Sequence, residues 1–147
     1  RRTIVNTFVG RCVQSSLVDT GIIVALLSRN DRCHAQAVEL LRQYEGLLLS
    51  TWPVIAEACA LVPEHAQVRV LEWMLEQGLE IFSIDDGAPF IQNYMADYRD
   101  LPCDFADASL VYAARRTGER EIWTIDEDFR IYRLPDKSRF KVIPGRE

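Results

Sequence analysis

Six acidic residues stand at positions where the chain is expected to bring them to one edge of a β-sheet. Two follow apolar runs typical of buried strands, and the others lie in or near expected helices and turns. The six are Asp19, Glu57, Asp104, Asp107, Asp126 and Asp128. Mg²⁺ and Mn²⁺ prefer oxygen ligands, and such an ion lowers the pKa of a bound water and offsets charge at a scissile phosphate. The pattern therefore indicates metal-assisted hydrolysis of phosphate esters.

The two strand-end acids are expected to meet. Asp19 ends the apolar run 16–18, and Asp126 ends the run 122–125. In an open parallel sheet, the carboxyl ends of strands line the ligand crevice where the strand order reverses. We therefore expect both side chains to line one crevice.

The helical acids have a different context. Glu57 is the lone carboxylate in the apolar stretch 54–61, and Asp104 and Asp107 are three residues apart at a helix start. That spacing places both aspartates on one face, near the positive end of the helix. Each acid also has a structural explanation, as an N-cap, a surface charge or a turn residue. Their combination is what favours a shared site.

The elements that must position these acids alternate between strands and helices. Short apolar or β-branched runs predict strands at 16–18, 47–50, 79–84, 122–125 and 140–143. Helical spacing predicts helices at 22–28, 35–45, 52–62, 64–77, 89–98 and 104–116. We expect Thr51 to cap one helix and Gly46 to end another. The alternation predicts an α/β fold with three α/β/α layers and a mostly parallel sheet of about five strands.

Composition predicts a single domain over residues 1–147. The chain has 147 residues, 48% of them hydrophobic, which suits one core. No apolar stretch has the length of a membrane span and no secretory signal is visible, so we expect a cytoplasmic protein. The four cysteines form no C-x-x-C pair, which argues against a zinc ribbon and a disulfide scaffold. We expect reduced thiols.

The charge distribution is uneven. The net charge is −5, yet residues 115–147 carry nine basic and seven acidic side chains. Basic side chains contact nucleic-acid phosphates. The candidates for such contacts are Arg115, Arg116, Arg120, Arg130, Arg133, Lys137, Arg139 and Lys141. We expect the acidic excess to belong in part to a metal site.

Four segments together resemble a known family. They are Leu17-Val18-Asp19-Thr20, Val54-Ile55-Ala56-Glu57, Asp104-Phe105-Ala106-Asp107-Ala108-Ser109-Leu110 and Thr124-Ile125-Asp126-Glu127-Asp128-Phe129. In order and spacing they are similar to the PIN-domain nucleases, and closely to the VapC-type toxins of toxin–antitoxin pairs. The resemblance runs from about Ser16 to Ile143. Residues 1–15 have no counterpart in it, which makes them an N-terminal extension of open role.

The resemblance implies a fold and an activity. It implies a parallel five-stranded sheet, RNA cleavage with Mg²⁺ (or Mn²⁺), a homodimer and inhibition by a cognate antitoxin protein. Asp19, Glu57 and Asp107 would be metal ligands or their supports, with Asp126 as the fourth acid. Whether Asp126 or Asp128 takes that role stays open, as does Thr20 as a polar support or a helix cap.

Two alternative functions fit part of the sequence. The strand-ending Asp19-Thr20-Gly21 also resembles the start of a haloacid-dehalogenase-type phosphatase. That family places a second Asp two residues after the first, where this chain has Ile22, and needs a later Lys, while the first Lys here is Lys137. The other alternative is a PIN fold that has lost its metal and serves as a binding module. All four acidic positions are filled, which disfavours it.

Overall fold

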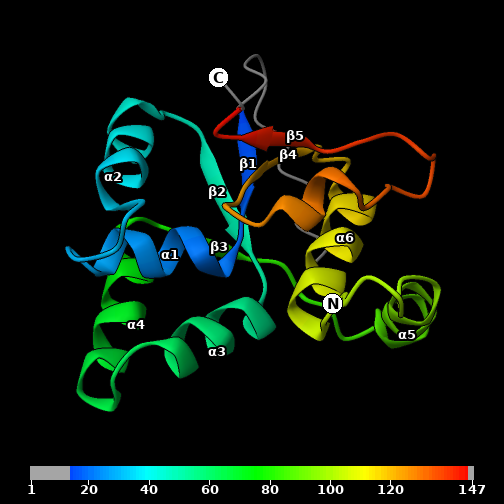
Figure 1. The fold of residues 1–147 in the computed structure, drawn as a ribbon, viewed down its shortest axis with the longest axis horizontal. Coiled ribbons are helices and arrows are strands. Elements are labelled where there is room, and N and C mark those ends of the chain that lie inside the picture. Colours follow the sequence, from blue (N-terminus) through cyan, green and yellow to red (C-terminus); the bar gives the residue numbers. More distant parts are fainter. Residues whose placement is uncertain (1–13, 146–147) are drawn as a thin grey trace.

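A parallel β-sheet forms the centre of the computed structural model, which describes residues 14–145 (Figure 1). Its strands are β1 (Ser15–Val18), β2 (Leu47–Ser50), β3 (Glu80–Ile81), β4 (Glu121–Trp123) and β5 (Lys141–Ile143). The strand order is β3-β2-β1-β4-β5, and every neighbouring pair is parallel. The order reverses between β1 and β4. The ligand crevice of such a sheet is expected at this point.

The central strands form the core of the sheet. Leu17 of β1 pairs with Leu49 on one side and Ile122 on the other, and Val18 pairs with Trp123. Leu17, Val18, Ile122 and Trp123 are fully buried. Strands covered on both faces are expected to be continuously apolar, as these are.

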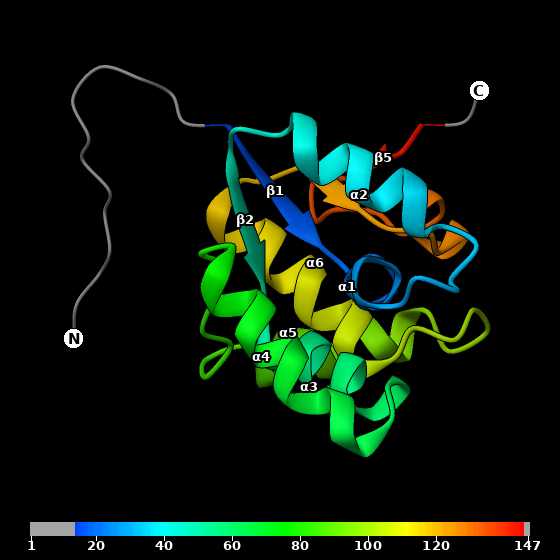
Figure 2. The same ribbon diagram turned by 90° about the vertical axis from the view of Figure 1, so that its left-hand side faces the viewer.

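Helices cover both faces of the sheet. They are α1 (Thr20–Leu27), α2 (His34–Gln43), α3 (Trp52–Leu61), α4 (Gln67–Glu76), α5 (Ala88–Asp97) and α6 (Phe105–Thr117), with 3-10 turns η1 (Glu64–Ala66) and η2 (Glu127–Arg130). In Figure 1, α1, α2 and α4 lie on one side and α5 and α6 on the other; Figure 2 shows α1 and α2 in front of the sheet and α6 behind it. The expected three-layer α/β/α fold is confirmed.

Helix α6 is the most deeply buried helix, since residues 106–114 are all buried. Alanines and a serine supply much of this stretch, so the helix backbone lies close to its neighbours. A capping box formed by Asp104 and Asp107 starts the helix, and Gly118 ends it in the left-handed conformation, with φ of 78°. The local sequence thus fixes both ends of the helix that carries Asp107.

Helix α3 connects the two layers. It contacts α1 and α4 as well as α6. Thr51, expected to be its cap, makes no side-chain capping hydrogen bond. Its buried hydroxyl instead bonds the hydroxyl of Ser109 on α6 (2.6 Å). This contact ties the start of α3 to α6 and leaves Glu57 on a helix that is held at both faces.

Thr51 is the N-cap residue of α3 by position, as expected. Two expectations about element ends were wrong. The third strand is limited to Glu80–Ile81, because it lies at the sheet edge and a turn closed by Gly87 N–H and the Ile84 carbonyl (2.8 Å) leads into α5. Helix α2 ends before Tyr44, and Gly46 lies beyond it, directly before β2. A Cβ on Gly46 would collide with the carbonyl of Gln14 and the ring of Tyr44. Close approach, and not helix capping, therefore requires this glycine.

The remaining expectations concern thiols and the N-terminal segment. Cys33, Cys59 and Cys103 are free, as expected for reduced thiols. Of the tryptophans, Trp52 is 56% exposed, whereas Trp73 is buried. None of the helices within residues 14–145 is long and apolar enough to cross a membrane. Most of the expected extension, residues 1–13, lies outside the described residues.

Candidate active site

Asp19 lies between β1 and α1 and has both carboxylate oxygens oriented. Its backbone N–H donates to the Trp123 carbonyl (2.9 Å), which continues the pairing of β1 with β4. Its Oδ1 accepts from the Thr20 N–H (2.7 Å), and its Oδ2 accepts from the Thr124 hydroxyl (2.7 Å). Only 4% of the residue is exposed. Asp19 therefore caps α1 and also belongs to the candidate site.

Thr124 joins the two strand-end acids. It follows β4 directly and is buried. Its hydroxyl donates to Asp19 Oδ2 and accepts from the Asp126 N–H (2.9 Å). One hydroxyl thereby fixes Asp126 relative to Asp19, as the strand-end argument requires.

Asp107 lies in the first turn of α6, where three contacts orient it. Its N–H donates to Asp104 Oδ1 (2.9 Å), and its Oδ2 accepts from the Asp104 N–H (3.4 Å). The same Oδ2 accepts from the Tyr132 hydroxyl (3.1 Å). Tyr132 is fully buried and also donates to the Pro102 carbonyl (3.3 Å). Asp107 is thus held by its own helix cap and by a tyrosine from the other end of the site.

Glu57 approaches the acids from α3. It is half-buried, and burial raises the pKa of its carboxyl. The side chain of Thr20 lowers that pKa, while the charges of Asp104 and Asp126 raise it. These interactions place Glu57 beside the start of α1, the start of α6 and the loop after β4.

The electrostatics of the cluster show uncompensated negative charge. Burial raises the pKa of Asp19 to about 6, and the charges of Asp126 and Glu57 raise it further against the hydrogen bonds from Thr124 and Thr20. Burial also raises the pKa of Asp107 to about 7, with the charges of Asp104 and Asp19 adding to it. No ion pair found in residues 14–145 includes any of the six candidate acids.

The six candidates differ in how closely they associate. The charges of Asp126 and Glu57 act on Asp19, that of Asp126 acts on Glu57, and that of Asp19 acts on Asp107. Asp104 acts on both Glu57 and Asp107, but it is exposed and its carboxylate caps α6. Among the six, Asp128 is linked only to Asp126: its N–H donates to Asp126 Oδ1 (2.9 Å), and burial followed by the charge of Asp126 raises its pKa. We therefore group Asp19, Glu57, Asp107 and Asp126 as a four-acid centre, with Asp104 and Asp128 at its margin.

The donor chemistry of this centre fits a divalent cation. All its candidate ligands are carboxylates, which suit hard ions. Carboxylates that raise one another's pKa are unfavourable without a counter-charge, and a cation would supply it. As the side chains stand, no group of three or more Asp, Glu, His or Cys side chains among the described residues is placed so that it could hold a metal ion.

Sequence reasoning missed two residues of the site. Thr124 lies two residues before Asp126 in the sequence. A hydroxyl at this distance from a strand-end acid could have indicated its role. Tyr132 had no such signal, because it lies 25 residues from Asp107 along the chain. Thr20 donates to the Val54 carbonyl (3.4 Å) and lowers the pKa of Glu57, in agreement with a polar support.

For the RNA cleavage that the family resemblance implies, we expect Thr124→Val to lower kcat/KM about tenfold to a hundredfold, with little change of fold. Valine keeps the shape but removes the hydrogen bond to Asp19 and the acceptor for Asp126. The pKa of Asp19 should rise further, so the pH–rate profile should shift upward, and Thr124→Ser should restore both. Thr117→Val, at the far end of α6, is the matched control. An unchanged profile in Thr124→Val would show that the hydroxyl does not position these acids.

Comparisons with known proteins agree on one fold. The PIN domain family model matches residues 16–134. Among solved structures, the crystal structure of Mycobacterium tuberculosis VapC20, described as a sarcin-ricin loop cleaving toxin, superposes with a TM-score of 0.70. It is 18% identical, and the match covers 78% of this chain and 92% of that one. A comparison with curated proteins gave no match.

Proposed function

Because the chain belongs to the PIN-domain family, with the family model covering residues 16–134, we propose that it is a metal-dependent endoribonuclease of the VapC toxin type. The carrying observation is the four-acid centre of Asp19, Glu57, Asp107 and Asp126, which has no ion-pairing cation among the described residues. The centre lies where the strand order reverses between β1 and β4, and open parallel sheets bind ligands at this point.

Asp19, Glu57, Asp107 and Asp126 would hold Mg²⁺ or Mn²⁺. The ion supplies an activated water at neutral pH and offsets negative charge at the scissile phosphate. Asp19 and Asp107 must be deprotonated to serve as ligands, and their raised pKa values make that step depend on pH near neutrality. Thr124 and Tyr132 hold the two aspartates in place through hydrogen bonds.

We assign the fourth acid to Asp126 and not to Asp128. The charge of Asp126 raises the pKa of both Asp19 and Glu57, whereas that of Asp128 is not among the main influences on either. Asp126 also shares the hydroxyl of Thr124 with Asp19. Asp104 and Asp128 then act from the margin, Asp104 by capping α6 and Asp128 by donating its N–H to Asp126.

The proposed substrate is RNA in the cytoplasm, and the proposed partners are a cognate antitoxin protein and a second copy of the chain. The resemblance to VapC toxins motivates both partners. Exposed apolar side chains support association: Trp52 is 56% exposed and Leu75 is 75% exposed. A strictly monomeric mass by light scattering at micromolar concentration would remove the homodimer from this proposal.

The proposed activity is tested by a time course on total cellular RNA with Mg²⁺, Mn²⁺ or EDTA. The parent should cut RNA with either ion and not in EDTA, and Asp19→Asn should be inactive under all three conditions because it lacks a central charge. Cleavage by Asp19→Asn at the parental rate would refute the proposal. Cleavage by the parent that continues in EDTA would refute the metal requirement.

A further inference from the structure

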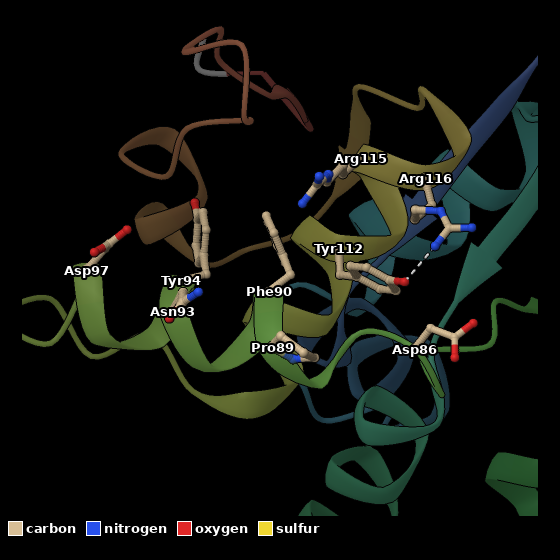
Figure 3. Close-up of a pocket in the computed structure, with 9 residues that line it drawn as sticks. All are labelled: Asp86, Pro89, Phe90, Asn93, Tyr94, Asp97, Tyr112, Arg115 and Arg116. Carbon is tan, nitrogen blue, oxygen red and sulfur yellow. Dashed lines mark hydrogen bonds between the residues drawn. The ribbon is translucent and has the colours of Figure 1, made fainter.

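A second candidate site lies between α5 and α6, away from the acids. It is a cavity of about 440 Å³, within the range of roughly 300–1,000 Å³ of small-ligand sites. Figure 3 shows side chains of both helices around it. Asp107 lies in the first turn of α6 and Arg115 in the last, so Arg115 lies about 12 Å along the helix from Asp107, and Tyr112, which also lines the cavity, lies between them.

Two arginines on the α6 side are held by aromatic rings and not by carboxylates. The Arg115 guanidinium lies 4.9 Å from the centre of the Phe90 ring. Arg116 donates to the Tyr112 hydroxyl (2.8 Å) and lies 5.7 Å from the centre of that ring. Neither arginine belongs to an ion pair found in residues 14–145. Both therefore keep N–H groups for an anion.

Four other basic residues of the C-terminal part are bound to acids or carbonyls. Arg120 pairs with Asp136, Arg130 with Glu127 and Lys141 with Glu121. Arg133 donates to three backbone carbonyls, those of Arg130, Ile131 and Tyr132. Among the basic residues expected to face phosphate, Arg115 and Arg116 are thus the pair that is both ordered by aromatic contacts and free of carboxylate partners.

The α5 side of the cavity supplies aromatic surface and polar groups. Phe90 stacks with Tyr94, with 5.7 Å between ring centres and 26° between planes, and Asn93 lies beside them. Asp86 and Asp97 stand at the two ends of the cavity in Figure 3. Aromatic rings and guanidinium planes stack with unpaired bases, and amide or carboxylate groups hydrogen-bond base edges. Among the described residues, Arg115 and Arg116 are the only cationic side chains that line the cavity, so an anionic group is expected to bind beside them.

We infer that this cavity binds one unpaired nucleotide of a single-stranded RNA, with the phosphate on the N–H groups of Arg115 and Arg116 and the base stacked on the face of the Arg115 guanidinium that is turned away from the Phe90 ring. The inference rests on the proposed function, since it treats the cavity as a part of the RNA path that leads to the acidic centre. The cavity offers two guanidinium groups, aromatic rings, and amide and carboxylate groups that can bond base edges. An acidic protein would use only the guanidinium groups, whereas a nucleotide of RNA would use all three kinds of group.

The test is binding of a fluorescent, short single-stranded RNA in EDTA, where cleavage does not interfere. Arg115→Gln and Arg116→Gln should each weaken RNA binding about threefold to tenfold and reduce the dependence of log K on log salt by about one. Phe90→Leu should weaken it about fivefold or more, with little change in that slope. Arg69→Gln, which removes an exposed charge from α4, should leave affinity nearly unchanged.

Three outcomes would overturn the inference. One is a parent that does not bind RNA at low salt. Another is equal affinity for the Arg115, Arg116 and Arg69 variants. The third is Arg115-dependent binding of poly-L-glutamate without binding of RNA, which would assign the cavity to an acidic protein partner. Because the assay contains no metal, it is independent of cleavage, so an inactive parent that still binds RNA through Arg115 would refute only the proposed catalysis.

Discussion

We expect RNA cleavage in Mg²⁺ or Mn²⁺ to fall at least about a hundredfold in Asp107→Asn and in Glu57→Gln. Each substitution keeps the side-chain volume and removes a charge that the cation needs. In Asp107→Asn the amide oxygen still accepts from Tyr132, so the fold should persist. The measurement is the initial rate of RNA cleavage, with circular dichroism to establish that each variant is folded.

The matched controls carry the same chemical changes outside the four-acid centre. Asp31→Asn lies in the turn before α2, where Asp31 accepts from the Cys33 N–H (2.8 Å), and Glu76→Gln lies on the exposed end of α4. Both controls should cut RNA at the parental rate. Parental rates in Asp107→Asn and Glu57→Gln as well would show that the ligand assignment is wrong.

The metal-free protein should lose stability as the pH rises from about 4 to about 7. The pKa values of Asp19 and Asp107 are about 6 and about 7 in the folded protein, against an ordinary value of 3.8. Between these values the folded state binds more protons than the unfolded state, so the free energy of unfolding falls as the pH rises. For a buried group, each tenfold change in proton affinity is worth about 1.4 kcal/mol, so the combined loss is several kcal/mol.

Asp107→Asn removes one of these charges and should therefore be more stable than the parent in EDTA at pH 8, by about 1–3 kcal/mol. Most buried polar substitutions destabilise, so the sign of this effect is diagnostic. Urea unfolding at pH 5 and pH 8 measures it, and the advantage of the variant should shrink at pH 5, where the parental carboxyl is protonated. A variant less stable than the parent at both pH values would contradict the assigned repulsion.

The sequence was informative where one local rule decides the position of a residue. Asp19 and Asp126 were predicted to meet because parallel strands end at a common edge, and Thr124 does join them through one hydroxyl. Asp104 and Asp107 were predicted to start a helix, and they form its capping box. The order of strands and helices was likewise predicted, because the strands are short apolar runs separated by helical spacing.

The rest depended on contacts between distant segments. Nothing near Tyr132 in sequence indicates its bond to Asp107, and nothing near Gly46 indicates that Gln14 crowds it. The basic residues of the C-terminal part were all candidates for phosphate contacts. In the structure, several of them pair with acids or backbone carbonyls. Only the tertiary structure distinguishes Arg115 and Arg116, which have no such partner among the described residues, from these residues. Such partners are set by packing, which has no local pattern.

Membership of the PIN-domain family also decides which of the two enzyme classes suggested by Asp19 applies. A strand-ending Asp-Thr-Gly is shared with haloacid-dehalogenase-type phosphatases, but the family model spans the segments that carry all six acids. The remaining alternative, a fold without its metal, differs from the proposed enzyme in one measurable property, which is the affinity of the four-acid centre for a divalent cation.

Mn²⁺ binding, followed by electron paramagnetic resonance of the free ion, tests the central claim most directly. The parent should bind Mn²⁺ and release it to excess Mg²⁺, and Asp107→Asn should bind at least about tenfold more weakly. Glu76→Gln should bind as the parent does. A parent that leaves Mn²⁺ free at millimolar concentration, or an Asp107→Asn protein with parental affinity, would contradict the claim that Asp19, Glu57, Asp107 and Asp126 form one cation site.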